Sequence, residues 1–158
     1  MEIERKWLLI KEFTLVFDIF KTVITKQIYI SGIRIRKTET VGIDGYKYYM
    51  AVKDDGTISR QEWEIEIPEW VFTQLDINNP HNPSIFKTVY KSKLGDLVLE
   101  FHVFEKDLSG LIILECEFKD EETAKAFDLP DEIKSCVIRE VTEDRRYQNK
   151  NLAITGLP

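Results

Sequence analysis

Polar and apolar residues alternate along much of the chain, beginning at its first residues. Glu2, Glu4 and Lys6 occupy every second position, and Ile3 and Trp7 lie between them. Alternate residues of a β-strand share a face, so this strand carries charge on one face and apolar surface on the other. The same alternation, or a run of β-branched and aromatic residues, predicts strands over residues 1–10, 22–30, 33–40, 46–53, 58–67, 85–93, 97–104 and 111–118.

Helical spacing is confined to short segments between or after these strands. Four apolar residues with i, i+3, i+4, i+7 spacing predict an amphipathic helix over residues 11–21: Phe13, Val16, Phe17 and Phe20. Short helices are also expected over residues 69–75 and 120–128. A turn and a helix are expected over residues 142–152, with Thr142 as the N-cap. The Asp54-Asp55-Gly56-Thr57 segment predicts a hairpin, because Asp-Gly tolerates positive φ.

Charges of both signs recur on the strand faces that are not apolar. The acids are Glu2, Glu4, Glu62, Glu64, Glu100, Glu115 and Glu117, and the bases are Lys6, Arg34, Arg36, Lys53, Arg60, Lys87 and Lys91. For any one strand, an ordinary sheet with a solvated outer face explains this pattern. Over all strands, the few short amphipathic helices favour a rolled sheet, with the helices on its apolar outside. We therefore expect a mainly β protein, a closed antiparallel barrel of about eight strands around a polar, charged tunnel.

Composition narrows the class of protein. The 158 residues are 43% hydrophobic and 32% charged, which predicts one domain spanning residues 1–158 with a substantial core. The net charge of -6 argues against non-specific nucleic-acid binding. Cys116 and Cys136 lack metal-site spacing and are expected to be reduced thiols. We expect no signal peptide and no membrane segment, hence a cytoplasmic protein whose oligomeric state the sequence leaves open.

A tunnel of this kind has a chemical logic. Clustered Lys and Arg side chains suit a polyanion, and Arg binds phosphate oxygens in bidentate fashion. Clustered carboxylates would repel that polyanion unless they held a hard cation such as Mg²⁺ or Mn²⁺. The combination predicts phosphoryl transfer or pyrophosphate cleavage. Of the two histidines, His81 is expected in a surface loop, and His102 shares the charged face with Glu100.

These residues resemble the CYTH domain, the triphosphate tunnel metalloenzyme family. Glu2-Ile3-Glu4-Arg5-Lys6 is similar to the family signature E-x-E-x-K. Further family patterns follow in order along essentially the whole chain: Arg34-Ile35-Arg36; Lys53 before the Asp-Gly hairpin; Ser59-Arg60-Gln61-Glu62-Trp63-Glu64; Gly110-Leu111 leading to Glu115-Cys116-Glu117-Phe118; and Val141-Thr142-Glu143-Asp144 with Tyr147-Gln148-Asn149 and Leu152-Ala153. The chain most resembles compact bacterial members, several of which act as inorganic triphosphatases.

The resemblance implies an eight-stranded barrel and metal-dependent hydrolysis of a small triphosphate, with water attacking the terminal phosphorus. The metal, Mg²⁺ or Mn²⁺, is expected on Glu2, Glu4, Glu115 and Glu117. The substrate phosphates are expected on Lys6, Arg34, Arg36, Lys53 and Arg60. The residues expected to act in catalysis are Glu4, Glu62, Glu64 and Lys87. Of these, Glu62 and Glu64 are expected to contact metal, position water or hold the bases.

Two positions depart from the family pattern. An arginine commonly lies two residues after the family lysine, and here that position is Val89. An aspartate often lies two residues after Glu100, and here it is His102. Both changes remove charge from the tunnel, and loss of one guanidinium weakens polyphosphate binding by about 1.5–3 kcal/mol where it made a charge-assisted bond. Lys91 and Arg146 are the candidates to replace it.

Alternative functions remain open at this point. A nucleoside triphosphatase is one alternative. A class IV-type adenylate cyclase is another, and it requires recognition of adenine, whereas the sequence shows no purine-selective feature. A thiamine triphosphatase requires an aromatic platform at the tunnel mouth, whereas Trp7 and Trp63 are predicted to face outward. Val89 and His102 favour a polyphosphate-binding protein that does not hydrolyse its ligand. A purely structural sheet with solvated charges is the remaining alternative.

Overall fold

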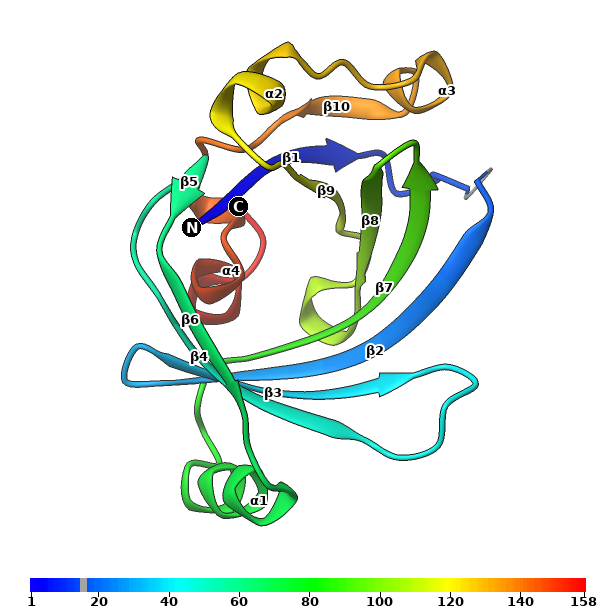
Figure 1. The fold of residues 1–158 in the computed structure, drawn as a ribbon. Helices are drawn as coiled ribbons and strands as arrows, with labels where there is room; N and C mark the ends of the chain where they lie inside the picture. Colours follow the sequence, from blue (N-terminus) through cyan, green and yellow to red (C-terminus); the bar gives the residue numbers. More distant parts are fainter. Residues whose placement is uncertain (15–16) are drawn as a thin grey trace.

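One antiparallel sheet curls on itself to form the body of the protein (Figure 1). The computed structural model describes residues 1–14 and 17–158. The strands are β1 (Glu2–Leu9), β2 (Ile19–Ile30), β3 (Ile33–Thr40), β4 (Lys47–Lys53), β5 (Ser59–Arg60), β6 (Glu62–Glu66), β7 (Ser84–Leu94), β8 (Leu97–Phe104), β9 (Ile112–Glu117) and β10 (Val137–Glu140). Along the sheet they follow the order β10-β1-β9-β8-β7-β2-β3-β4-β6, and β5 pairs with β1 off this path.

The barrel closes nearly completely between β1 and the segment that contains β5 and β6. Glu2 pairs with Arg60 and Ile3 with Ser59, while the Glu4 amide donates to the carbonyl of Ile58 at 2.9 Å. The prediction of a mainly β antiparallel barrel is confirmed, but the prediction of eight strands is wrong. Nine strands lie along the path within the described residues. The difference arises because β10 pairs with the second half of β1.

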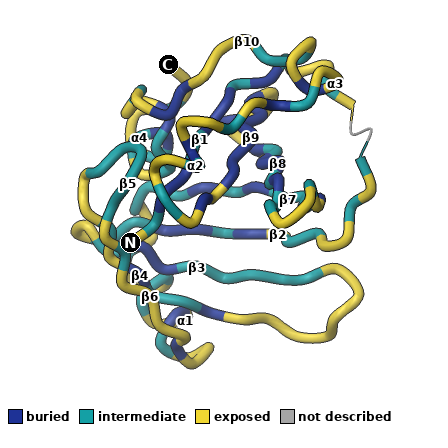
Figure 2. Tube along the Cα trace, turned by 45° about the horizontal axis from the view of Figure 1, so that its top comes forward, coloured by how far each residue is buried: buried dark blue, intermediate teal, exposed yellow. Residues whose placement is uncertain are grey.

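Helices cover the apolar outside of the barrel, as the pattern predicts. α2 (Glu121–Ala126) and α3 (Asp131–Lys134) lie over a cluster on β1, β8 and β9 that contains Trp7, Phe101 and Leu114. α1 (Glu69–Asn78) covers a second cluster on β2, β3 and β4, where Phe72 packs at 5.3 Å from Tyr48. Figure 2 shows that burial is deepest along β1, β8 and β9. The opposite, charged faces of the strands therefore point into the barrel.

A third apolar cluster forms the floor of the barrel interior. Strand faces that point inward change from charged to apolar at one level: Lys6 to Leu8, Lys87 to Ile85, His102 to Phe104 and Glu115 to Ile113. Tyr147 of the 3₁₀ helix η2 (Arg145–Tyr147) and Leu152 of α4 (Asn149–Thr155) complete this cluster. We call it the apolar floor. It places the innermost charged side chains against hydrocarbon rather than water.

Several helix predictions are wrong. Residues 11–14 and 17–18 form no helix and β2 begins at Ile19, while residues 15–16 of the predicted helix lie outside the described residues. Phe13 and Phe17 instead stack on Phe101, at 5.3 and 6.2 Å. Thr142 is not an N-cap; its hydroxyl accepts from the Lys6 amide at 3.0 Å. The helix α3 was not predicted. Among the described residues, no helix has the length and apolar character needed to span a membrane.

Candidate active site

The charged residues of β1 divide between the inside and the outside of the barrel as their alternation predicts. Glu4 and Lys6 are buried in the interior. Arg5 faces outward, where its guanidinium donates to both oxygens of Glu140 at 2.8 Å and to the carbonyls of Ala124 and Phe127. This outer clamp holds α2 and β10 against β1, so that the inner face is presented by a fixed strand.

A tight hairpin brings the opposing wall to β1. Asp54 accepts hydrogen bonds from the amides of Gly56 and Gln61, at 2.9 and 3.0 Å. A Cβ on Gly56 would lie 2.0 Å from the carbonyl oxygen of Ser59, so only glycine fits this position. Gly56 does not have the positive φ that the sequence pattern suggested; the close approach of the backbone is the reason for the glycine. The hairpin sets Arg60 opposite Glu2.

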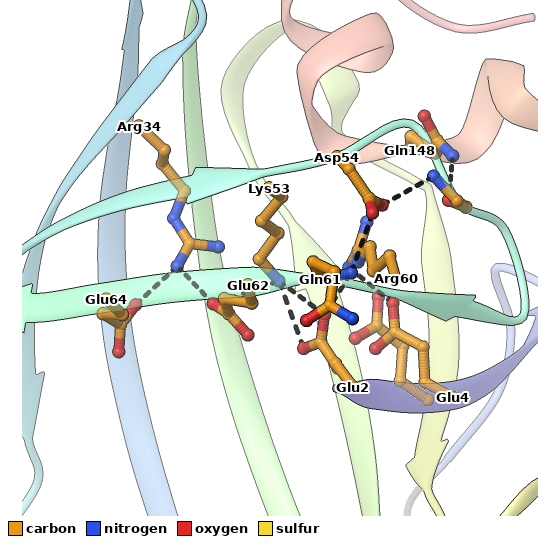
Figure 3. A network of polar contacts seen from close by, with 12 residues as sticks. Glu2, Glu4, Arg34, Lys53, Asp54, Arg60, Gln61, Glu62, Glu64 and Gln148 are labelled. Atoms are coloured by element: carbon orange, nitrogen blue, oxygen red, sulfur yellow. Dashed lines mark hydrogen bonds and ion pairs between the residues drawn. The ribbon is translucent and has the colours of Figure 1, made fainter.

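Lys53 and Arg60 bind the two glutamates of the N-terminal motif (Figure 3). Arg60 donates from Nε to Glu2 and from Nη2 to Glu4, each at 2.7 Å. Lys53 donates to both oxygens of Glu2, at 3.0 and 3.1 Å, and its Nζ lies 3.4 Å from Glu62. Against the effect of burial, Lys53 and Arg60 lower the pKa of Glu2. Both glutamates of the motif are thus engaged by residues predicted to bind phosphate.

The pairing continues in both directions along the wall. Arg34 donates to Glu64 at 2.6 Å and lies 3.4 Å from Glu62 (Figure 3). Arg36 also donates to Glu64, at 3.1 Å. At the other end, Lys6 lies 3.1 Å from both Glu4 and Glu115. Five acids and five bases therefore alternate in one series: Glu115, Lys6, Glu4, Arg60, Glu2, Lys53, Glu62, Arg34, Glu64 and Arg36. We call this series the ion-pair chain.

Lys87 and Glu117 are the predicted site residues that the ion-pair chain leaves out. Lys87 is 3% exposed and lies at the apolar floor, with its Nζ 5.4 Å from the ring of Phe104 and 3.5 Å from Oδ1 of Asn149. Burial lowers the pKa of Lys87 to about 7, reinforced by the positive charges of Lys6, Arg34 and Arg36. This residue is therefore a buried amine that is partly neutral at physiological pH.

The pKa of Glu117 is raised, whereas that of Lys87 is lowered. Glu117 is exposed at the end of β9 and lies opposite Glu4 in the register of β1 and β9. Partial desolvation by the neighbouring strands raises the pKa of Glu117, and the negative charges of Glu2, Glu4, Glu100 and Glu62 raise it further. A hard divalent cation prefers carboxylate oxygens and would remove their mutual repulsion, but among the described residues Glu117 and its acidic neighbours do not converge into a group of three ligands. Glu117 makes no ion pair within the described part of the chain.

These side chains surround a cavity of about 700 Å³. All the predicted site residues except Lys6 line it, and Lys6 contacts the lining residues Glu4 and Glu115. A second cavity of about 390 Å³ adjoins it, sharing Arg36, Lys87 and His102 as lining residues and containing Val89. The first volume is within the usual range for small-molecule sites.

Some lining residues were not predicted. Gln27 on β2 is 1% exposed, and its Oε1 has no hydrogen-bond partner among the residues that the structure describes. Its alternation with Thr25 and Tyr29 was a detectable signal, because all three point inward. Asn149 enters the cavity from α4; it belongs to one of the family patterns, but no site role was predicted for it. Of the two candidates to replace the missing arginine, Lys91 lines the cavity, whereas Arg146 lies outside it and donates to Asp144 at 2.7 Å.

Comparison with known proteins gives close relatives, although no family model matches the chain. Over 114 residues the chain is 40% identical to the inorganic triphosphatase of Nitrosomonas europaea, covering 70% of this chain and 71% of that protein. It is 34% identical over 146 residues to the inorganic triphosphatase of Acetivibrio thermocellus, covering 90% of each.

Solved structures agree with these relatives. The crystal structure of an inorganic triphosphatase matches all of this chain and 97% of its own, with a TM-score of 0.66 and 31% identity. A conserved hypothetical protein from Pyrococcus furiosus shares the fold, with a TM-score of 0.52 over 85% of each chain. Together with the charged interior of the barrel, these relatives show that the chain belongs to the CYTH, or triphosphate tunnel metalloenzyme, family.

Proposed function

We propose that this protein is a metal-dependent triphosphatase that cleaves the terminal phosphate from inorganic tripolyphosphate. The observation that carries the proposal is the ion-pair chain, in which five bases and five carboxylates from β1, β3, β4, β5, β6 and β9 form one continuous series in the interior. A metal–triphosphate complex presents negative oxygens to the bases and a cation to the acids. The acids that bind the cation exchange a base for a metal ion, and the bases gain phosphate oxygens as partners, so binding leaves no buried charge unpaired.

The proposed binding roles follow from position. Lys6, Arg34, Arg36, Lys53 and Arg60 bind the phosphate oxygens, and Glu2, Glu4, Glu115 and Glu117 bind Mg²⁺ or Mn²⁺. All four metal residues offer carboxylate oxygens, the donors that these ions prefer. When bound, the cation supplies Lewis-acid stabilisation of charge on the phosphoryl oxygens. Glu62 and Glu64 act by holding Lys53, Arg34 and Arg36 in place, because each of these bases lies within 3.4 Å of one of the two glutamates.

Lys87 is proposed as the general base. A pKa of about 7 makes its neutral amine available near physiological pH, and the best catalytic base is one poised near the working pH. In this step water forms a bond to the terminal phosphorus and loses a proton to Nζ of Lys87. The bond from phosphorus to the bridging oxygen breaks, and its electron pair leaves with pyrophosphate. The products are orthophosphate and pyrophosphate.

The second cavity supports a second candidate, an organic triphosphate such as a nucleoside or thiamine triphosphate. Tyr46 and Tyr49 line this cavity and offer aromatic surface next to Arg36 and Lys87. Against this reading, Lys37 lies 4.0 Å over the ring of Tyr46 and Arg36 lies 5.1 Å over that of Tyr49, so one side of each ring is already covered. Trp7 is buried under Phe127 and Trp63 lies on the outer face of β6, so neither tryptophan forms a platform in the interior.

A substrate panel tests the proposal. Tripolyphosphate, ATP and thiamine triphosphate are compared at equal concentration with Mg²⁺ or Mn²⁺, and orthophosphate and pyrophosphate are measured. We expect tripolyphosphate to give the highest kcat/KM and equimolar products. Glu4→Gln is expected to lose about 100-fold or more of this activity while its circular dichroism spectrum is unchanged. Unchanged phosphate release by Glu4→Gln would contradict the proposed site, and binding without release would indicate a polyphosphate-binding protein.

A further inference from the structure

His102 occupies a position between two carboxylates at the deep end of the cavity. It lies on β8 and is 4% exposed. Its Nε2 lies 3.3 Å from Oε2 of Glu100, on the same strand, and 3.2 Å from Oε2 of Glu115 on β9. These three side chains form a convergent group, with one ligand atom from each lying within 4.8 Å of the others. Among the described residues, no other His, Cys, Asp or Glu side chains form such a group of three.

Lysines fix the two carboxylates so that one oxygen of each is directed at the imidazole. Lys91 donates to Oε1 of Glu100 at 2.7 Å, and Lys6 donates to Oε1 of Glu115 at 3.1 Å. The Oε2 atom of each carboxylate is therefore the one left facing His102. Each lysine holds its carboxylate from the far side, so the two Oε2 atoms and Nε2 are oriented without further rearrangement.

The imidazole lies close to carboxylate oxygens but makes no well-directed hydrogen bond with any described residue. Although two carboxylate oxygens lie near Nε2, neither Nε2 nor Nδ1 makes a hydrogen bond with acceptable direction in the described part of the chain. A single N–H also serves only one of two acceptors. If Nε2 carried a lone pair instead, it would repel both carboxylates. An unpartnered polar ring in a buried position is costly, so the arrangement needs an account beyond packing.

We propose that Nε2 of His102 and the Oε2 atoms of Glu100 and Glu115 bind one divalent first-row transition ion of the Zn²⁺ or Co²⁺ type, in preference to Mg²⁺. Metal–ligand bonds of about 2.0–2.1 Å at tetrahedral angles separate neighbouring ligand atoms by about 3.3–3.4 Å. The observed separations of 3.3 and 3.2 Å from Nε2 match this value. An imidazole nitrogen suits these ions, whereas Mg²⁺ requires oxygen ligands.

This inference extends the proposed function, because Glu115 also belongs to the carboxylates proposed to hold Mg²⁺ or Mn²⁺. The two ideas are tested separately. Hydrolysis of tripolyphosphate with Mg²⁺ alone tests the proposed function, and binding of Zn²⁺ in the absence of substrate tests this site. Failure of one measurement leaves the other outcome intact.

The experiment titrates Zn²⁺ into the full-length protein by calorimetry, in a large excess of Mg²⁺ and without triphosphate. Cys136→Ser is used as the background in every protein to remove the accessible thiol. His102→Gln removes the nitrogen ligand, and His81→Gln is the matched control, because His81 is the other of the two histidines and is exposed in a loop. We expect one Zn²⁺ per chain in the background protein and in His81→Gln, and at least about 100-fold weaker binding in His102→Gln.

Two further readouts do not depend on how the variant folds. Co²⁺ bound to the background protein is expected to give the visible absorption bands of a low-coordinate ion. In ¹⁵N-labelled protein with its native His102, Zn²⁺ is expected to shift the Nε2 resonance of His102 and not the resonances of His81. Absence of Zn²⁺ binding in excess Mg²⁺, equal binding by His102→Gln, or a shift confined to His81 would overturn the proposal.

Discussion

Replacing Lys87 by Met tests the electrostatic description of the apolar floor. Lys87 is 3% exposed, and its pKa is lowered from the ordinary 10.5 to about 7, first by burial and then by Lys6, Arg34 and Arg36. At about 1.36 kcal/mol for each pH unit, this difference corresponds to a cost of about 4–5 kcal/mol for holding the charged amine in the folded protein. Methionine has a similar length and no charge, so Lys87→Met removes this cost.

The sign of the effect depends on pH. Below pH 7 the amine is protonated in both states, so the folded protein bears the full cost of the buried charge. Between pH 7 and 10.5 only the unfolded chain keeps the proton, and the free energy of unfolding of the wild type rises with pH. Lys87→Met should therefore be more stable than the wild type by about 4 kcal/mol at pH 6 and by about 2 kcal/mol at pH 9.

Urea unfolding followed by circular dichroism, at pH 6 and pH 9, measures both differences. Lys93→Met is the matched control, because Lys93 lies on the same strand but is exposed. We expect its stability difference from the wild type to be small and nearly independent of pH. The reasoning is refuted if Lys87→Met is no more stable than the wild type at pH 6, or if its advantage does not shrink by pH 9.

Three further predictions concern binding and turnover. In pH profiles of tripolyphosphate hydrolysis, kcat/KM should rise as pH increases through about 7, because the proposed base Lys87 must be neutral; a fall above pH 7 would identify Lys87 as a phosphate ligand instead. In calorimetric titrations with an unreactive triphosphate analogue, Mg²⁺ should tighten analogue binding, and the analogue should tighten Mg²⁺ binding by the same factor. The reason is that acids and bases of the ion-pair chain must be separated together. Independent binding of the two would contradict this prediction. Val89→Arg should lower the Kd of such an analogue by about tenfold in the same titration, because a guanidinium in the second cavity adds a charge-assisted bond of about 1.5 kcal/mol. An unchanged Kd would show that a side chain at position 89 does not reach the phosphates.

The inward and outward faces of the strands could be predicted from the sequence because they depend on local alternation. Glu2 and Glu4 line the cavity, and Ile3 and Trp7 are buried on the outside with α2 and α3. The helix expected over residues 11–21 failed for a related reason. Apolar spacing says that a segment has a buried face, but Phe13 and Phe17 achieve burial by stacking on Phe101, a residue remote in the sequence.

Features that depend on closure of the barrel could not be predicted from the sequence. β10 and β5 pair with different halves of β1, so neither has a pairing partner close in the sequence. The apolar floor is similar: Ile85 and Phe104 continue the charged inward faces of β7 and β8, and only the arrival of η2 and α4 explains why they are apolar. Without the floor, the burial and the lowered pKa of Lys87 could not be anticipated.

The ion-pair chain also decides which groups are expected to titrate during the proposed reaction. When a metal–triphosphate complex binds, each of the chain's ten members keeps an opposite charge nearby and hence its own charge. Lys87, lowered to a pKa of about 7 at the apolar floor, and Glu117, raised among other carboxylates at the end of β9, lie outside the chain. Groups that stay ion-paired keep a fixed charge, so proton transfer in such a site must involve its unpaired groups. Among the predicted site residues, the pH dependence of hydrolysis should therefore belong to Lys87 and, until a cation neutralises its surroundings, to Glu117.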